Sequence, residues 1–402
     1  MPAITDVTDL QNMENDLAGD YWLANDIDAS ATSGWNGGDG FLPIGLGAPY
    51  FTGSFDGKGY TISDLYIDRA ATDYIGLFGV VHTAGGGVSI KDVTLTDVDI
   101  TGDDCVAALV GYIYGDAACA ITDIIISGSV DGDDFVGALI GQEYTTTDLT
   151  ITDCSSSADI TGLDDFVGGL IGGTYFADIL RVFSTGTVVG GGWWTGGLIG
   201  HFWGTGTLAE SYATGSVTNA GGTYVGGLIG RAREVGSITD CYARGAVTGD
   251  DFVGGLVGEL GTGTITNSFS SGLVTGNTNT GGLCGFNDDT ITDCFWDTQT
   301  SGQAASSGGT GKTTSQMKTK TTFTAADWDF IVIWFINGVT NGGYPFHWSM
   351  PTEPIESPRE TVDTEDKITL ECVRNVEMAA GGRFYVDKEG KACYRSRYAR
   401  NA

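Results

Sequence analysis

Pairs of adjacent aspartates are the residues of this sequence whose chemistry is easiest to name. They precede a recurring glycine-rich hexapeptide, as Asp103-Asp104, Asp133-Asp134, Asp164-Asp165 and Asp250-Asp251. Carboxylate oxygens are preferred ligands of Ca²⁺, and carboxyl pairs also cleave glycosidic bonds. The simplest interpretation is a turn aspartate that accepts backbone hydrogen bonds. Of the two functional alternatives, calcium binding by the first three pairs is favoured over catalysis, because stacked like charges attract a counter-ion.

Aromatic side chains form a second candidate site. Connections that follow the hexapeptides carry Tyr112, Tyr114, Tyr144, Tyr175, Phe176, Phe202 and Trp203, with Trp193 nearby. Aromatic rings on aligned loops predict a face that stacks on sugars or contacts a protein, and the alternative is local packing beneath the loops. Two further aromatic columns, which begin at Tyr74 and Phe183, predict stacking ladders that fix the register between repeats.

Other catalytic patterns are missing from the sequence. The three histidines form no HExxH pair, which excludes a zinc peptidase of that type, and no GxSxG elbow is present. The segment GGTGKTT (308–314) resembles a phosphate-binding loop, but Ser306 occupies the position of its first glycine. We therefore expect a non-enzymatic protein that has no cofactor other than a possible calcium ion.

A repeated hexapeptide must position these residues. Its copies include VGALIG (136–141), VGGLIG (167–172) and VGGLVG (253–258), and the closing glycines fall at 79, 111, 141, 172, 200, 230, 258 and 285. A block such as ITDC (151–154) and a third short run follow each copy. Three strand-like runs in about 30 residues predict one coil of a β-helix, whereas a propeller blade needs about 40 residues.

The predicted fold is therefore all-β: a parallel β-helix solenoid of about eight coils, right-handed as is usual, with caps at both ends. Glycine supplies 65 of the 402 residues, which suits tight corners between short strands. At roughly 4.8 Å per coil the rod would be about 40 Å long. Cys154, Cys241 and Cys294 then lie too far apart for disulfides and are expected to be buried thiols, while Cys372 and Cys393 could pair.

Composition divides the chain into five segments. Residues 1–74 predict a cap and a first irregular coil, with Thr8 or Asp9 capping a short helix. Residues 75–302 hold the repeats, and 303–350 a loop followed by an aromatic C-terminal cap. Residues 351–366 are a proline-rich acidic linker. Residues 367–402 are basic and predict a helix near 369–380 and a hairpin at 383–397, which we expect to dock other virion or surface subunits.

Charge and hydropathy limit the classes of partner that the protein can bind. Residues 1–350 contain 10 of the 19 Lys and Arg and 41 of the 51 Asp and Glu, so they carry −31 of the net −32. Such a body repels nucleic acid. No segment has the apolar length of a membrane span, and the first residues show no signal-peptide pattern. We expect no nucleic acid and no membrane insertion, and either a virion or an extracellular location.

The repeats resemble those of the GLUG-repeat family. The resemblance rests on VGGLIG, on the ITDC and SYATG blocks and on the terminal CFWDTQTSGQAASSGGTGKTTSQMK (294–318). It implies a large surface-exposed or secreted bacterial protein, in some cases adhesin-like or attached to a peptidase. The segment AAGGRFYVDKEGKACYRSR (379–397) is similar to a module of bacteriophage minor tail proteins.

These observations together predict a structural or adhesive protein. The expected setting is a phage tail or tail tip that displays a binding face to a host-surface glycan or protein. A bacterial surface adhesin and a polysaccharide depolymerase that uses the stacked aspartates are the alternatives.

Overall fold

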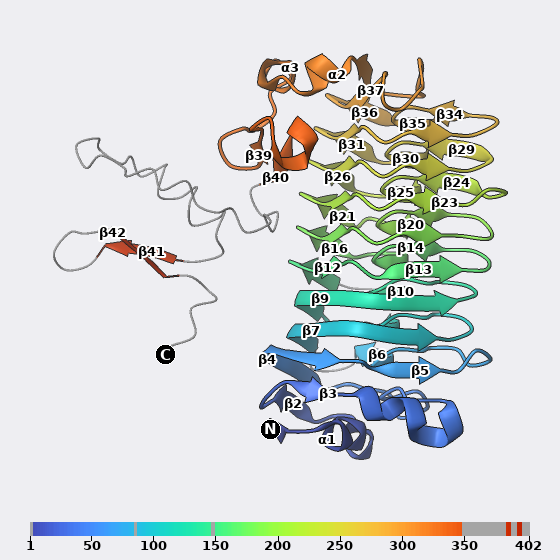
Figure 1. Ribbon diagram of the computed structural model, residues 1–402, viewed down its shortest axis with the longest axis vertical. Coiled ribbons are helices and arrows are strands. Elements are labelled where there is room, and N and C mark those ends of the chain that lie inside the picture. Colours follow the sequence, from blue (N-terminus) through green and yellow to red (C-terminus); the bar gives the residue numbers. More distant parts are fainter. Residues whose placement is uncertain (1–2, 84–86, 146–148, 348–382, 387–391, 396–402) are drawn as a thin grey trace. The chain divides into compact units, whose positions relative to one another are not determined.

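The computed structural model describes residues 3–83, 87–145, 149–347, 383–386 and 392–395, and it divides into two units, Met1–Thr314 and Ser315–Ala402. The first unit is a parallel β-solenoid whose coils are stacked along one axis (Figure 1). This arrangement confirms the predicted fold class.

One coil is represented by five short strands. In the coil that begins at Val167 they are β14 (Val167–Gly168), β15 (Ile171–Thr174), β16 (Asp178–Leu180), β17 (Phe183–Ser184) and β18 (Val188–Val189). The expected count of three runs is wrong, because the hexapeptide turns a corner between β14 and β15, and the ITDC-type block is followed by a strand of its own. The coil therefore contributes to three sheets rather than to one.

The sheet that we call sheet B collects the second half of every hexapeptide. Its members in order along the axis are β6 (Phe78–Thr83), β8 (Val110–Gly115), β10 (Ile140–Thr145), β15, β20 (Ile199–Trp203), β25 (Ile229–Arg233), β30 (Val257–Leu260) and β35 (Cys284–Asn287). Ile140, Ile171, Ile199 and Ile229 are paired in one continuous register. The hexapeptides thus form a single file of eight coils, as predicted.

The first half of the hexapeptide lies in a smaller sheet. Its strands are β14, β19 (Thr195–Gly196), β24 (Thr223–Gly226), β29 (Asp251–Gly254) and β34 (Thr280–Gly281). Between the two sheets the hexapeptide leucines are fully buried, and their backbones continue the ladder, as in Leu170 N–H to Leu198 O at 2.9 Å. Each buried leucine contributes about 1.5–3 kcal/mol.

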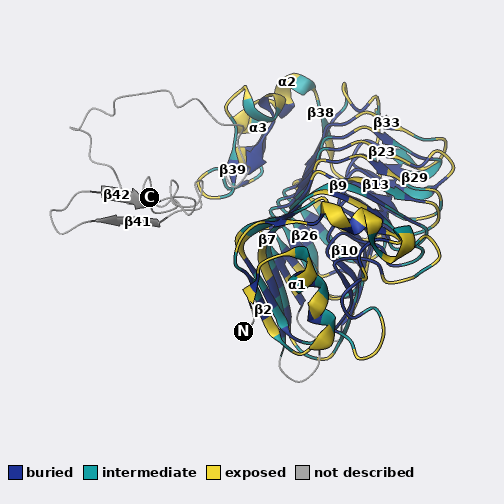
Figure 2. Cartoon of the chain, turned by 60° about the horizontal axis from the view of Figure 1, so that its bottom comes forward, coloured by how far each residue is buried: buried dark blue, intermediate teal, exposed yellow. Residues whose placement is uncertain are grey.

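A 25-stranded sheet forms the remaining wall of the solenoid. It contains β1 (Ala3–Ile4), β2 (Asp20–Leu23), β3 (Ile27–Asp28), β4 (Ser54–Ser63), β5 (Tyr66–Asp68), β7 (Val88–Thr101), β9 (Cys119–Gly132), β11 (Leu149–Thr152), β12 (Ser155–Ser156), β13 (Asp159–Gly162), β16, β17, β18, β21 (Thr207–Ala209), β22 (Tyr212–Ala213), β23 (Val217–Thr218), β26 (Ser237–Thr239), β27 (Tyr242–Ala243), β28 (Val247–Thr248), β31 (Thr264–Thr266), β32 (Phe269–Ser270), β33 (Val274–Thr275), β36 (Thr290–Thr292), β37 (Phe295–Asp297) and β38 (Thr310–Lys312). Buried residues are concentrated on the strands of these walls, and exposed ones at the turns (Figure 2).

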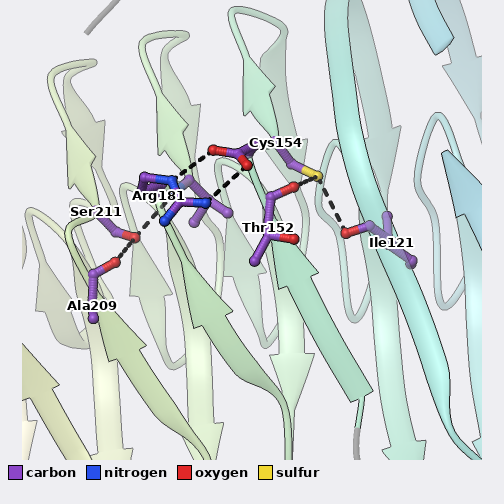
Figure 3. A network of polar contacts seen from close by, with 8 residues as sticks. Ile121, Thr152, Cys154, Arg181, Ala209 and Ser211 are labelled. Atoms are coloured by element: carbon purple, nitrogen blue, oxygen red, sulfur yellow. Dashed lines mark hydrogen bonds and ion pairs between the residues drawn. The ribbon is translucent and has the colours of Figure 1, made fainter. Parts of the chain in front are cut away.

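Bends in this wall occur where one coil contacts the next through polar groups. Arg181, with φ 54°, donates from Nε and Nη2 to both oxygens of Asp153, at 2.8 and 2.9 Å (Figure 3). Nearby, the Cys154 thiol donates to the carbonyl oxygens of Thr152 and Ile121, at 3.2 and 3.7 Å. Cys154, Cys241 and Cys294 are all buried and free, as predicted. Cys372 and its proposed pairing lie outside the described residues.

The N-terminal cap differs in detail from the expectation. Helix α1 (Val7–Gln11) is capped by Asp6, whose carboxylate accepts the backbone N–H groups of Thr8 and Asp9. The expected caps Thr8 and Asp9 are wrong, because the helix begins two residues earlier than the apolar pattern shows. Leu10, Met13 and Leu17 are buried beneath the cap. The 3-10 segments η1 (Asn12–Asn15) and η2 (Ser30–Gly38) complete the cap.

The second unit contains short elements with an aromatic core. They are α3 (Lys320–Thr324), β39 (Trp334–Phe335), η3 (Thr340–Gly343) and β40 (Phe346–His347), while α2 (Thr314–Met317) begins at the last residue of the first unit. Trp328 and Trp334 pack with ring centroids 4.6 Å apart, and β39 pairs with β40. Strands β41 (Arg383–Val386) and β42 (Ala392–Arg395) pair antiparallel, as the predicted hairpin requires. The predicted linker at 351–366 and helix at 369–380 lie outside the described residues.

Close coil spacing makes a clear prediction at Gly215. A Cβ at this position would overlap the carbonyl oxygen of Gly186 in the preceding coil, whereas a Cβ at the exposed Gly221 meets nothing within 4 Å. We expect Gly215→Ala to lower the free energy of unfolding by roughly 2–3 kcal/mol. Gly221→Ala, the control, should change it by less than about 1 kcal/mol. Chemical denaturation measures both, and equal stability of the two variants would contradict the close stacking.

Candidate functional site

The outer surface of sheet B carries a row of rings that we call the aromatic row. His82, Tyr114 and Tyr144 occupy one register position on consecutive strands. Ring contacts join His82 to Tyr114 at 4.5 Å, Tyr144 to Tyr175 at 4.8 Å and Tyr175 to Trp203 at 5.4 Å. Tyr144 is 50% exposed and Trp203 is 37% exposed. The row therefore presents ring surface to solvent along five successive coils.

A second line of side chains, which we call the corner ladder, runs beside this row. Its members are Tyr74, Cys105, Phe135, Phe166, Trp194, Tyr224 and Phe252, and all have φ between 51° and 64°. Left-handed backbone is uncommon for bulky residues, so each corner carries a conformational cost. Stacking offsets it: Phe135 and Phe166 lie 4.0 Å apart and nearly parallel, and Tyr224 and Phe252 lie 4.8 Å apart. This ladder and the one through Phe183, Tyr212 and Tyr242 confirm the predicted stacking.

Contacts between the row and the ladder join them into one face, which we call the aromatic face. Tyr112 lies 5.4 Å from Tyr74 and 5.5 Å from Tyr114, ring to ring. His201 stacks on Trp194 at 5.1 Å and lies 6.0 Å from Trp203. The face thus extends across two lines of side chains as well as along the axis.

Seven of the eight aromatic candidates lie at this surface, and one does not. Tyr112, Tyr114 and Tyr175 are half-buried, whereas Tyr144, Phe176, Trp193 and Trp203 are exposed. Phe202 is fully buried, in register with Ala232. Its assignment to the surface is wrong, because it follows the closing glycine by two residues and alternation turns that position inward.

Several residues of the face escaped the sequence analysis. Arg231 lies over the rings of Trp194 and Tyr224, at 5.7 and 5.2 Å, and pairs with Glu259 at 3.0 Å. Burial, together with the charges of Arg231 and Arg233, lowers the pKa of His201 to about 3. His201 is therefore a neutral member of the face at physiological pH. The usable signal was its position one residue after a closing glycine, which it shares with Tyr112.

Glu143 is a buried carboxylate beneath the face. It is fully buried, in register with Ile113. One oxygen accepts hydrogen bonds from the backbone N–H and the hydroxyl of Thr145, and the other from the hydroxyl of Thr174 and the N–H groups of Tyr175 and Phe176. Five donors compensate the buried charge. Glu143 thereby anchors the loop that carries two of the candidate rings.

The acidic pairs stack along the corner beside the ladder. The backbone N–H of Asp133 donates to Asp103 O at 2.8 Å, and that of Asp164 to Asp133 O at 3.2 Å. Asp134 Oδ1 accepts the N–H of Asp165 at 2.6 Å. In the fourth pair, the carboxylates of Asp250 and Asp251 accept side-chain donors from residues 277–279. The backbone donor to Asp134 agrees with the simplest interpretation, whereas the donors that reach the fourth pair from the next coil are side chains.

Three of the six calcium candidates also come close together. One carboxylate oxygen each from Asp134, Asp164 and Asp165 lies within 4.8 Å of the others, a geometry that could hold a cation. Asp104 approaches the group by accepting the N–H of Asp134 at 3.3 Å. Asp103 and Asp133 join the stack through their backbone. Oxygen ligands suit Ca²⁺, although three carboxylates supply only part of its coordination sphere.

The environment of these carboxylates changes their ionisation. Burial raises the pKa of Asp134 to about 6, aided by the neighbouring carboxylates of Asp104, Asp164 and Asp165 and opposed by the hydrogen bond from Asp165. Burial also raises the pKa of Asp104 and that of Asp165. Either protonation of one carboxyl group or a bound cation is therefore favoured at this corner over three ionised carboxylates without a counter-ion.

The raised pKa predicts a pH-dependent stability. The pKa of Asp134 is higher in the folded than in the unfolded protein. The protonated side chain therefore contributes to the stability of the folded state below about pH 4, and this contribution is lost as the pH rises through about 6. Asp134→Asn keeps an oxygen for the Asp165 N–H, so it should stabilise the protein at pH 8 and have little effect at pH 4. We expect about 1 kcal/mol at pH 8 after solvent screening. Thermal melts across this range measure it, and a pH-independent difference would contradict the assignment.

Calcium binding makes a separate prediction. If the three carboxylates hold Ca²⁺, millimolar calcium should raise the melting temperature of the wild type at pH 8. Asp164→Asn should abolish the rise, because it removes one ligand. Asp178→Asn, in which an aspartate outside the cluster is changed, is the control. An equal rise in all three proteins would show that the cation acts by general screening.

One protein family and two proteins of known sequence are similar to parts of this chain. The family described as "The GLUG motif" matches residues 221–248. A stretch of 134 residues, 31% of the chain, is 40% identical to Halomucin of Haloquadratum walsbyi and spans 1% of that protein. A stretch of 111 residues, 26% of the chain, is 39% identical to the "Putative Gly-rich membrane protein" of Evansella cellulosilytica and spans 12% of it.

A solved structure shares the fold. It is named as the crystal structure of "a putative immunoglobulin A1 protease" from Bacteroides ovatus, with a TM-score of 0.52 and 16% identity, over 86% of this chain and 91% of that one. At this identity the likeness concerns the fold alone. Together, the match at 221–248 and the stacked parallel coils support the resemblance to GLUG-repeat β-helices.

Proposed function

We propose that this chain is a non-enzymatic structural and adhesive part of a surface-exposed protein, and that its aromatic face binds a cell-surface glycan or protein. The observation that carries the proposal is the row of rings in register from His82 to Trp203, in which Tyr144 and Trp203 are open to solvent. A contiguous exposed apolar surface is expensive to maintain in water and marks interaction sites. The rigid coils beneath hold the rings in place before a ligand arrives, which lowers the entropic cost of binding.

Two settings are proposed for this adhesive role. The names of the matched relatives, a halomucin and a glycine-rich membrane protein, favour a cell-surface or extracellular location. The resemblance of residues 379–397 to phage tail modules favours a virion appendage in which 367–402 docks other subunits. In the described part of the chain, no helix has the length and hydropathy needed to cross a bilayer. Antibody labelling of intact cells and of purified virions distinguishes the two settings.

A second candidate function, polysaccharide cleavage, is favoured by one observation. Asp134, with its pKa raised to about 6, lies beside Asp164 and Asp165 and next to the corner ladder. A protonated carboxyl close to an ionised one is the arrangement of retaining glycosidases. Against it, Asp134 and Asp165 already accept backbone N–H groups that hold the corner. Release of reducing ends by the wild type but not by Asp134→Asn would favour cleavage over adhesion.

The adhesive proposal predicts the effect of removing two exposed rings. Tyr144→Ala with Trp203→Ala should weaken binding to a glycan array or to host cells by at least about tenfold, equivalent to 1.4 kcal/mol. The matched control is Ile125→Ala, which removes a side chain that is 51% exposed in β9, on another wall. Binding that is unchanged in the double variant, with its melting temperature intact, would contradict the proposal.

A further inference from the structure

A hollow interrupts the aromatic face at its N-terminal end. It is lined by His82, Tyr114, Gly115, Asp116 and Tyr144, which come from β6, β8, β10 and the turn after β8. These elements belong to the first three coils of sheet B. The hollow therefore lies at one end of the aromatic row and is continuous with it through Tyr144.

Gly115 explains why the surface is hollow here. It lies in register between Thr83 and Thr145, and its φ of 137° is in the region that favours glycine. A Cβ at this position would come within 2.5 Å of the Thr83 carbonyl oxygen. Glycine allows the end of β8 to approach β6 closely, and it leaves no side chain to fill the space between the flanking rings.

The walls of the hollow combine fixed rings with unused polar groups. The Tyr114 ring is held by His82 at 4.5 Å and by Tyr112 at 5.5 Å, both nearly parallel, and by the edge of Tyr50 at 5.8 Å. Among the described residues no side-chain hydrogen bond is made by His82, Tyr114, Asp116 or Tyr144. Ring surface, hydroxyl groups, an imidazole and a carboxylate are thus all available to a ligand.

We propose that this hollow binds one pyranose unit of a neutral glycan, an inference that rests on the proposed adhesive function. A pyranose has an apolar C–H face, which suits a ring such as Tyr114, and a rim of hydroxyls that need hydrogen-bond partners. Asp116 and His82 offer those partners at the edge. The aromatic row from Tyr144 to Trp203 then receives the following units, so the glycan runs along the axis of the solenoid.

Charge decides between neutral and anionic sugars. Residues 1–350 carry a net charge of −31, and Asp116 is exposed at the hollow itself. A uronic-acid or sulfated unit would meet this negative field and a carboxylate without a paired cation. A neutral unit avoids that repulsion and still uses the carboxylate as a hydrogen-bond acceptor. The proposal therefore commits to a neutral sugar.

The test compares defined oligosaccharides by isothermal titration calorimetry on the full chain. The probes are neutral hexasaccharides of glucose, galactose, mannose and N-acetylglucosamine, with hexagalacturonate as the anionic counterpart. We expect at least one neutral probe to bind and hexagalacturonate to bind at least about tenfold more weakly. Tighter binding of the anionic probe, or no binding of any neutral probe at millimolar concentration, overturns the proposal.

Variants then locate the bound unit. Asp116→Asn and Tyr114→Ala should each lower the affinity for the neutral probe by about tenfold. Asp64→Asn, at an exposed aspartate that follows β4 of the 25-stranded sheet and does not line the hollow, is the matched control and should have no effect. Asp116→Asn changes only an exposed group, so it keeps the test decisive if Tyr114→Ala fails to fold. Binding that Trp203→Ala weakens, and that neither hollow variant changes, overturns this inference while leaving the adhesive function standing.

Discussion

The structure depends on one constraint, the short and constant separation between backbones of successive coils. At roughly 4.8 Å per coil, every backbone N–H and C=O along a strand can be paired with the coil above and below, as the unbroken ladder through the buried leucines illustrates. The same separation leaves no room for a Cβ at some positions. At Gly215 and Gly245 an added Cβ would overlap the carbonyl oxygen of the preceding coil. The high glycine content therefore follows from the close stacking of the coils, because only glycine fits at these positions.

Stacking also accounts for the behaviour of the charged residues. A repeat that places an aspartate at a corner places the next aspartate one coil away, so like charges accumulate along an edge. The protein limits this cost by using carboxylates as acceptors for the following coil, as Asp134 does for Asp165 and Asp159 for Thr187. Where burial is added, as at Asp134, the pKa rises and the corner becomes sensitive to pH and to cations. At this corner the carboxylates of Asp104, Asp134 and Asp165 each accept a backbone N–H from the next coil, which offsets part of the cost of bringing like charges together.

The aromatic face arises from the same regularity. Corners with left-handed backbone direct Phe135, Phe166 and Trp194 into one ladder, and alternation in sheet B directs Tyr114 and Tyr144 into the adjacent row. A rigid wall of rings results without any loop having to close over a ligand. Glu143 adds a local device, because a buried carboxylate with five donors fixes the loop of Tyr175 and Phe176. Recognition at this face would therefore depend on preorganised surface rather than on induced fit.

The sequence by itself determined the features that follow from periodicity: the file of hexapeptides, the two stacking ladders, the stacked aspartates and the buried cysteines. Each is a residue type repeated at a fixed offset, and a solenoid turns a fixed offset into a line in space. Only the tertiary structure decided which way each side chain points and what it meets. The residue one or three positions after a closing glycine faces outward, as His201 and His82 do, whereas Phe202 at two positions faces inward. Glu143 shares that inward position, and its five partners come from two coils, a relation that no local pattern in the sequence contains.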